Sequence, residues 1–335
     1  MTAMTTSPAR ERRGELAAGT LFVCLGWVLL GSGAWLYARM KGIPESAAMP
    51  VAAAFIVELT FYLLAGTGAA RNWLGSRGKN RVPEVLAACG VVPWLMYSLA
   101  TDEAHLTAFL LLLLIGLVVS LWYVVLPAAP LVDGLFLAAL AAIYLSRAFD
   151  WIYPSPIAKQ SISVLGKLML IRTAAIAILV IRGNVKAEFR FVPNRGEWTK
   201  GLLFFAPALA AVGVTYWALG LIEMRVHPLN VFQALGTFLG ILWAVALPEE
   251  FFFRGLLQQW LERWTGHAIV ALLVASVIFG SAHLGFHRIF PNWRWAIVAA
   301  VLGLFLGLAW RNSRSVQTSM VTHALIVTVW RTFLR

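Results

Sequence analysis

Charged residues are scarce in this chain, and cysteine is almost absent. Asp, Glu, Lys and Arg make up 13% of the 335 residues, whereas 60% are hydrophobic. In soluble globular domains about a quarter of the residues are charged, so this composition excludes a soluble protein. The two cysteines, Cys24 and Cys89, lie inside apolar runs, and the sequence therefore predicts neither a disulfide framework nor a cysteine metal cluster.

Apolar runs recur along the whole chain. About 20 apolar residues are needed for an α-helix to cross the ~30 Å hydrocarbon core of a membrane. We therefore predict an all-α fold, a polytopic transmembrane helix bundle of ten or eleven spans. The first run follows a basic N-terminus but is too long for a signal-peptide core, so we expect it to be retained. The predicted spans are residues 17–38, 48–70, 83–101, 105–127, 131–147, 160–181, 201–223, 229–250, 267–286, 295–311 and 315–333.

The formal net charge of +12 raises the question of a nucleic-acid partner. The basic residues are instead spread over the short segments between predicted spans. Sixteen Lys and Arg residues fall on the side of the N-terminus and nine on the opposite side. By the positive-inside rule we expect a cytoplasmic N-terminus. The lipid bilayer, and no nucleic acid, is the expected environment, and the expected location is a bacterial plasma membrane.

Residues 182–200 form the most polar segment and the predicted boundary between two regions. We predict an N-terminal transmembrane bundle of unknown role over residues 1–195 and a second domain over residues 196–335. Within the spans of the first region, Lys167 and Arg172 are exceptional charges. Snorkelling or a partner on another helix can accommodate each of them.

In the second region, small residues recur at four-residue spacing. They are Gly236, Gly240 and Ala244 in one predicted span, and Gly303 and Gly307 in another. Such ladders allow helix backbones to approach closely in lipid, so we expect a tight bundle there.

Two adjacent carboxylates and an arginine interrupt the apolar run over residues 232–264. Ionised side chains inside a membrane are costly and are functional candidates by default. Glu250 and Arg254 are four residues apart and share a helix face, whereas Glu249 lies about 100° away. One carboxylate can therefore be held by the arginine while the other points elsewhere. A structural ion pair between helices is the alternative interpretation.

Two histidines in later spans are predicted to reach the same depth as the glutamates. If the chain reverses at Thr265-Gly266, Glu249 and His283 are nearly equally far from the turn. His323 lies nine residues beyond Arg314, roughly 13 Å into the membrane. Equal depth requires the glutamate helix to extend past the membrane surface through Gln258, Gln259 and Glu262.

A carboxylate and a histidine around one water molecule form a general-base site, and a second histidine can donate a hydrogen bond to the developing oxyanion. The chemistry that these residues predict is hydrolysis of an amide inside the membrane.

These residues resemble the CPBP family of intramembrane proteases, which includes type II CAAX prenyl endopeptidases and bacteriocin-processing or bacteriocin-immunity proteins. Glu249-Glu250-Phe-Phe-Phe-Arg254 matches the EExxxR motif, and Phe279-Gly-Ser-Ala-His283 matches FxxxH. His323 stands where the third motif begins. The resemblance covers about residues 230–330 and places the catalytic helices in the C-terminal half.

The resemblance implies that Glu249 activates water with His283, that Glu250 and Arg254 support the site, and that His323 helps to bind the oxyanion. The implied partner is a protein or peptide substrate, prenylated or membrane-anchored in some members of the family.

One position departs from the family pattern. The third motif usually reads HxxxN or HxxxD, but Val327 stands at its last position. Valine has no hydrogen-bonding group, and loss of one oxyanion donor costs about 10²–10³ in rate in another protease. A neighbour such as Thr322 or Thr328 can compensate, or the enzyme is slower, or catalysis is lost.

The sequence leaves metal use and function class open. We favour a metal-free, glutamate-based mechanism without a cofactor. The alternative is zinc held by Glu249, His283 and His323, since catalytic zinc sites take three protein ligands. A His283–His287 metal pair is a further alternative. Besides the intramembrane peptidase, two other functions are considered: a catalytically silent membrane binding or immunity protein of the same fold, and a transporter with an ion relay.

Overall fold

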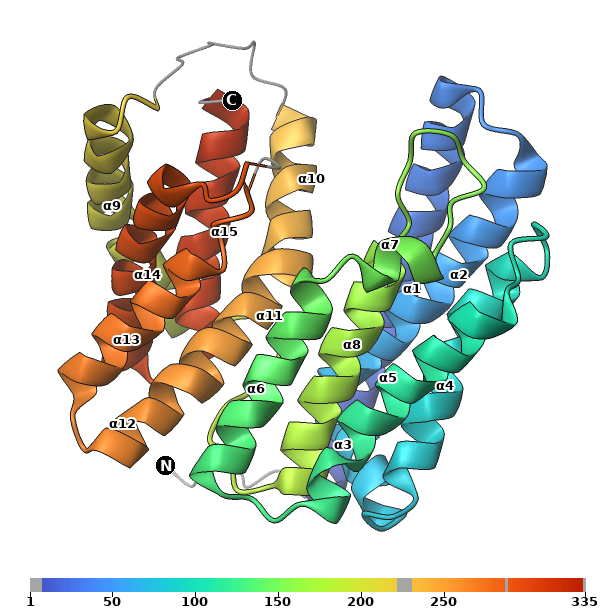
Figure 1. Cartoon of the computed structure of the whole chain (residues 1–335), viewed down its shortest axis with the longest axis horizontal. Coiled ribbons are helices and arrows are strands. Elements are labelled where there is room, and N and C mark those ends of the chain that lie inside the picture. The colour runs from blue at the N-terminus through green and yellow to red at the C-terminus, as the bar shows by residue number, and fades with distance from the viewer. Residues whose placement is uncertain (1–7, 222–230, 287–288, 334–335) are drawn as a thin grey trace. The chain divides into compact units, whose positions relative to one another are not determined.

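The computed structural model describes residues 8–221, 231–286 and 289–333, and every regular element in these ranges is a helix (Figure 1). This confirms the predicted all-α class. Seven of the described helices are long and apolar enough to cross a membrane, and three shorter ones are also apolar. The chain is therefore a polytopic helical membrane protein, and each predicted span coincides with a helix.

The chain separates into two compact units, unit 1 over Met1–Val185 and unit 2 over Lys186–Arg335. The division falls in the polar segment singled out in the sequence. The assignment of distinct roles to residues 1–195 and 196–335 stays a prediction.

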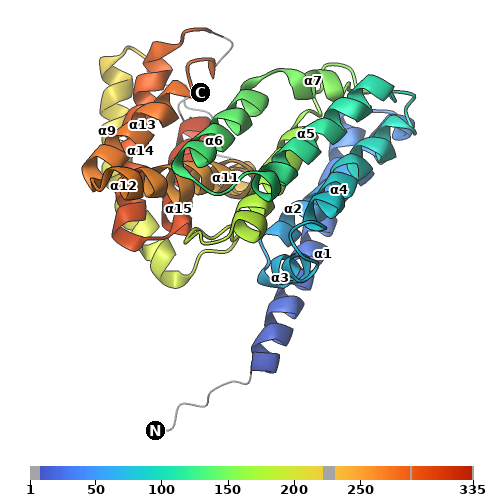
Figure 2. The ribbon, with the colours of Figure 1, turned by 60° about the horizontal axis from the view of Figure 1, so that its bottom comes forward.

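Unit 1 is built around the most buried of its candidate spans, Val164–Arg182, in which α8 continues as the π-helical segment η1. Helices α1 and α2 pack along each other (Figure 2). The elements of unit 1 are α1 (Pro8–Lys41), α2 (Glu45–Ala65), α3 (Gly68–Ser76), α4 (Val82–Ser98), α5 (Leu106–Val125), α6 (Pro130–Leu145), α7 (Ala148–Ile152), α8 (Val164–Ile176) and η1 (Ala177–Arg182).

The charges inside unit 1 are held by partners on other helices. Arg172 donates hydrogen bonds at 2.6 and 3.1 Å to the two carboxylate oxygens of Glu58 on α2, and both side chains are buried. Lys167 places its ammonium 5.1 Å from the centre of the Tyr144 ring on α6. The predicted pairing with another helix is thus confirmed for Arg172.

Unit 2 begins with an extended segment that leads into α9. A capping box starts this helix: the Asn194 side chain accepts a hydrogen bond from the Glu197 amide, and the Glu197 carboxylate accepts one from the Asn194 amide. The elements are α9 (Arg195–Ala218), α10 (Val231–Ile241), η2 (Leu242–Ala246), α11 (Leu247–Glu250), η3 (Phe251–Gln258), α12 (Gln259–Thr265), α13 (Ala268–Ser281), α14 (Trp293–Ser313) and α15 (Val316–Phe333).

Helix α15 is enclosed by its neighbours. It packs against α9, α10 and α14, and its residues from Val316 to Ala324 are all buried. Gly201 permits the approach of α9, because a Cβ there would lie 2.7 Å from the Val321 side chain. This central helix carries His323.

The two predicted glycine ladders differ in their surroundings. A Cβ at Gly303 would lie 3.2 Å from the Ser276 Cα, and one at Gly307 would lie 2.3 Å from a Leu272 methyl group, so α13 and α14 depend on glycine there. At Gly236 and Gly240, a Cβ would meet nothing within 4 Å. The prediction of close packing is confirmed for the second ladder and wrong for the first.

Candidate active site

Glu249 and Glu250 end the short helix α11, between the π-helical segments η2 and η3. The whole stretch from Val231 to Thr265 is one candidate span. A π-helix changes the direction of the side chains that follow it, and such segments occur frequently at functional sites. The carboxylates therefore lie where the helix departs from regular α geometry.

Glu250 is completely buried and is the centre of a three-residue cluster. Its Oε1 accepts a hydrogen bond from Arg254 Nη1 at 3.2 Å and lies 2.8 Å from His323 Nδ1. When Glu250 is ionised it can only accept, and the facing nitrogen of His323 then carries the proton. The structure thus contains the predicted pair of Glu250 with Arg254 and adds His323 to it.

Glu249 lies on the other side of the same imidazole. Its Oε2 is 3.9 Å from His323 Nε2, and this oxygen accepts no hydrogen bond within the described structure. The side chain is 27% exposed, against 0% for Glu250. The two adjacent carboxylates therefore face different nitrogens of one ring, and the Oε2 of Glu249 is buried although part of its side chain is exposed.

His283 lies just beyond the end of α13 and is half-buried. Its Nδ1 is 2.8 Å from the backbone oxygen of Phe279. Because a carbonyl oxygen only accepts, Nδ1 carries the proton in this contact, and in the neutral ring Nε2 then keeps a lone pair. Among the described residues, no hydrogen bond or ion pair joins His283 to Glu249 or His323. Both histidine rings instead pack against one aromatic ring.

That ring belongs to Phe279. Its centroid lies 4.9 Å from the His283 ring and 5.9 Å from the His323 ring, and the Arg254 guanidinium carbon is 4.3 Å from it. No role for Phe279 was predicted from the sequence. The available signal was its position in FxxxH, four residues before His283 on the same helix face.

The structure also shows what surrounds Val327. The hydroxyl of Thr322 donates to the backbone oxygens of Gly201 and Thr318, and that of Thr328 donates to Ala324. Each hydroxyl hydrogen has a backbone acceptor. Compensation for Val327 by either threonine stays a prediction.

The predicted zinc ligands do not come together in a metal-binding arrangement. Within residues 8–221, 231–286 and 289–333, no group of three His, Cys, Asp or Glu side chains is close enough to hold a metal ion. His287 lies outside the described residues. The zinc alternative stays a prediction, and we derive no step through a metal ion.

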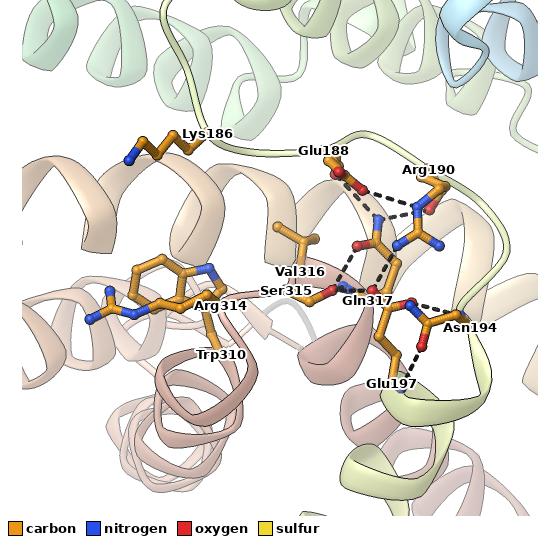
Figure 3. Close-up of a pocket in the computed structure, with 10 residues that line it drawn as sticks. All are labelled: Lys186, Glu188, Arg190, Asn194, Glu197, Trp310, Arg314, Ser315, Val316 and Gln317. Carbon is orange, nitrogen blue, oxygen red and sulfur yellow. Dashed lines mark hydrogen bonds and ion pairs between the residues drawn. The ribbon is translucent and has the colours of Figure 1, made fainter. Parts of the chain in front are cut away.

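A separate polar pocket of about 220 Å³ lies where the segment before α9 meets the turn between α14 and α15 (Figure 3). Arg190 and Ser315 both donate hydrogen bonds to Glu197, at 2.7 and 2.6 Å. Hydrogen bonds to Glu262 raise the pKa of Arg314, which stacks on Trp310. None of the predicted catalytic residues lines this pocket. The lining residues are Lys186, Glu188, Arg190, Asn194, Glu197, Trp310, Arg314, Ser315, Val316 and Gln317.

Residues 231–329 match the family model described as type II CAAX prenyl endopeptidase Rce1-like. The range runs from α10 into α15 and includes all five predicted catalytic residues. No curated protein and no solved structure matches the chain. The match confirms the resemblance inferred from the three motifs, and it indicates a CAAX-type membrane protease domain within unit 2.

Proposed function

With a CAAX-type endopeptidase domain over residues 231–329 as the premise, we propose that the protein hydrolyses peptide bonds of a protein or peptide substrate within the membrane. The substrate class is a membrane-anchored chain, prenylated chains included. The observation that carries the proposal is the placement of His323 between Glu250 and Glu249, each facing a different ring nitrogen.

In this mechanism Glu249 removes a proton from water as the water oxygen forms a bond to the carbonyl carbon of the substrate. The Nε2 lone pair of His283 accepts the second hydrogen of the water. His323, oriented by Glu250 at Nδ1, donates from Nε2 to the oxyanion. The carbon–nitrogen bond then breaks, and the proton on Glu249 passes to the leaving amine. The products are a carboxylic acid and an amine.

Arg254 and Glu250 act without touching the substrate. The guanidinium neutralises part of the Glu250 charge and orients the carboxylate, while Glu250 fixes the His323 ring. Without these partners, the buried charge of Glu250 would strongly destabilise the folded protein.

A catalytically silent binding or immunity protein of the same fold is the second candidate. It is favoured by Val327, because the nearby threonine hydroxyls are bound to backbone oxygens. In that case the polar cluster of unit 2 has only a structural role.

The decisive experiment compares wild type with Glu249→Gln in the source organism. New protein termini in the membrane fraction are mapped by mass spectrometry. Glu84→Gln is the matched control, since Glu84 is an exposed carboxylate of unit 1. Termini that appear with wild type and the control, but not with Glu249→Gln, support hydrolysis and identify substrates. Identical termini in all three strains, at equal protein abundance, favour the silent protein.

A further inference from the structure

From Glu250 to the end of its helix, polar side chains recur at every fourth position: Glu250, Arg254, Gln258 and Glu262. We propose that Gln258, which lies outside the three motifs, is a positioning residue that fixes Glu250 opposite His323. It does so by holding the π-helical segment at one register on α14. The proposal rests on the proposed hydrolysis and deepens it.

Two consecutive members of this polar row bond to the backbone of α14. Arg254 Nη2 donates to the oxygen of Gly303 at 3.2 Å, and Gln258 Nε2 donates to the oxygen of Gly307 at 3.3 Å. The two donor residues are four apart in η3, and the two acceptor residues are four apart in α14. The two hydrogen bonds therefore follow each other at the same spacing along both helices. A slip of one helix along the other by one turn would change both pairings together.

The row ends in an ion pair at the exposed end of the helix. Glu262 accepts hydrogen bonds from both terminal nitrogens of Arg314, at 2.9 and 3.0 Å. Gln258 is 1% exposed, because it lies on the face toward α14, where its amide has an acceptor. The expected extension of this helix past the membrane surface stays a prediction.

Glycine is required on α14 for these contacts. A Cβ at position 303 would lie 3.3 Å from Arg254 Nη2, and one at position 307 would lie 2.7 Å from Gln258 Oε1. The two glycines therefore expose their backbone oxygens to side chains that a larger residue would displace.

The π-helical winding keeps the row aligned. In an α-helix, residues four apart drift by about 40° around the axis, so a row at this spacing leaves one face after a few steps. The i→i+5 pattern of η3 turns less per residue and reverses part of the drift. Arg254 and Gln258, both in η3, can then face the same neighbour.

Packing alone does not account for an amide at position 258. The Oε1 of Gln258 accepts no hydrogen bond in the described structure, although it is buried. An aliphatic side chain would fill the site without leaving this oxygen unsatisfied. The contact that the amide adds is the one from Nε2 to Gly307, and it ties the register of the catalytic helix to α14.

The test compares Gln258→Met with Gln259→Met in the full-length protein in lipid nanodiscs. Methionine has a similar volume to glutamine but cannot donate. Gln259 is the matched control, because its amide oxygen accepts from Arg263 at an exposed position. The substrate is a peptide spanning a cleavage site found by mapping termini. We expect Gln258→Met to lower kcat by about tenfold to a hundredfold, with KM unchanged, as for a small misplacement of a catalytic group.

Amide hydrogen exchange gives a readout that needs no activity. Peptides covering residues 247–258 should exchange faster in Gln258→Met than in wild type or Gln259→Met, at an unchanged thermal midpoint. Unchanged exchange and kcat in Gln258→Met would overturn the proposal, and so would equal losses in both variants. If wild type cleaves no peptide, the proposed hydrolysis fails, and the exchange comparison alone decides whether Gln258 holds the segment.

Discussion

His323 contacts two adjacent glutamates through its two ring nitrogens. Nδ1 lies 2.8 Å from Glu250, which is buried, and Nε2 lies 3.9 Å from Glu249, which is partly exposed. Glu250 Oε1 thus has two side-chain partners, whereas Glu249 Oε2 accepts no hydrogen bond in the described structure, and we expect the two carboxylates to differ in role. This difference in environment divides the roles of two residues with identical chemistry.

The first prediction concerns this division. Glu250→Gln keeps an oxygen that can accept from His323 Nδ1, but it removes the negative charge that stabilises a protonated ring. We expect kcat to fall by about 10²–10³, the cost of losing one oxyanion donor, with little change in KM. Steady-state cleavage of a mapped peptide measures both constants. An unaltered kcat would show that the His323 cation is not needed.

The second prediction concerns Arg254, which is 1% exposed and bonds to Glu250 and Gly303. Arg254→Met removes the guanidinium that faces the buried Glu250, which should destabilise unit 2 by about 3 kcal/mol. Arg254→Lys should recover only part of the lost stability, because the ammonium group of lysine cannot reproduce the planar guanidinium that bonds to both Glu250 and Gly303. Thermal unfolding in detergent provides the measurement. Full stability of Arg254→Met would contradict the buried-pair interpretation.

The third prediction concerns Val327, one turn beyond His323 on α15. Val327→Asn supplies the missing amide, so the rate of hydrolysis should rise, by up to about tenfold to a hundredfold if the amide reaches the oxyanion. Val329→Asn is the control, since it adds the same group to another face of the helix. Equal rates for wild type and Val327→Asn would indicate that the site does not use this position.

The fourth prediction compares glycines of the two ladders. Gly307→Ala forces a Cβ against Leu272 and should cost about 1–3 kcal/mol, the usual penalty of overpacking. Gly240→Ala meets open space and gains helix propensity, so its stability should equal or exceed that of wild type. The two midpoints of thermal unfolding can be compared directly. Equal destabilisation by both substitutions would contradict the packing described for α13 and α14.

The fifth prediction concerns metal. We expect dialysis against a chelator to leave the rate of peptide cleavage unchanged, and added Zn²⁺ not to increase it. Metal analysis of the purified protein accompanies the assay. Loss of activity on chelation, with recovery on addition of zinc, would replace the glutamate-based mechanism with a metal-dependent one.

Local spacing was sufficient to predict part of the site. Glu250 and Arg254 are four residues apart, and equal depth placed His323 near them although it is 73 residues away in sequence. The motif order located the domain, and the family match over residues 231–329 agrees with it. The direct hydrogen bond from His323 to Glu250 was not predictable, because it depends on how α15 is rotated about its axis.

The partners of the buried charges in unit 1 could not be predicted from the sequence. Arg172 stands out in its predicted span, but its partner Glu58, 114 residues away, is not predictable from the sequence. The same holds for Asp133, which accepts hydrogen bonds from Arg182 at 2.6 and 2.8 Å. Each is a single acidic residue in an apolar run, and pairing across that distance leaves no periodic signal. Close packing was also wrongly predicted at Gly236 and Gly240, because residue spacing does not reveal which face of a helix contacts a neighbouring helix.

The enclosure of α15 bears on how the protein is made. This helix is absent from the described segments that meet the hydropathy and length criteria for a span, and it is rich in Ser, Thr, Gln and His. Lipid would accept such a segment poorly on its own. Helices α9 and α14 are synthesised earlier and offer it a protein-lined environment in place of hydrocarbon. We therefore expect α15 to enter the membrane only together with α9 and α14, in the same step that brings His323 to Glu250.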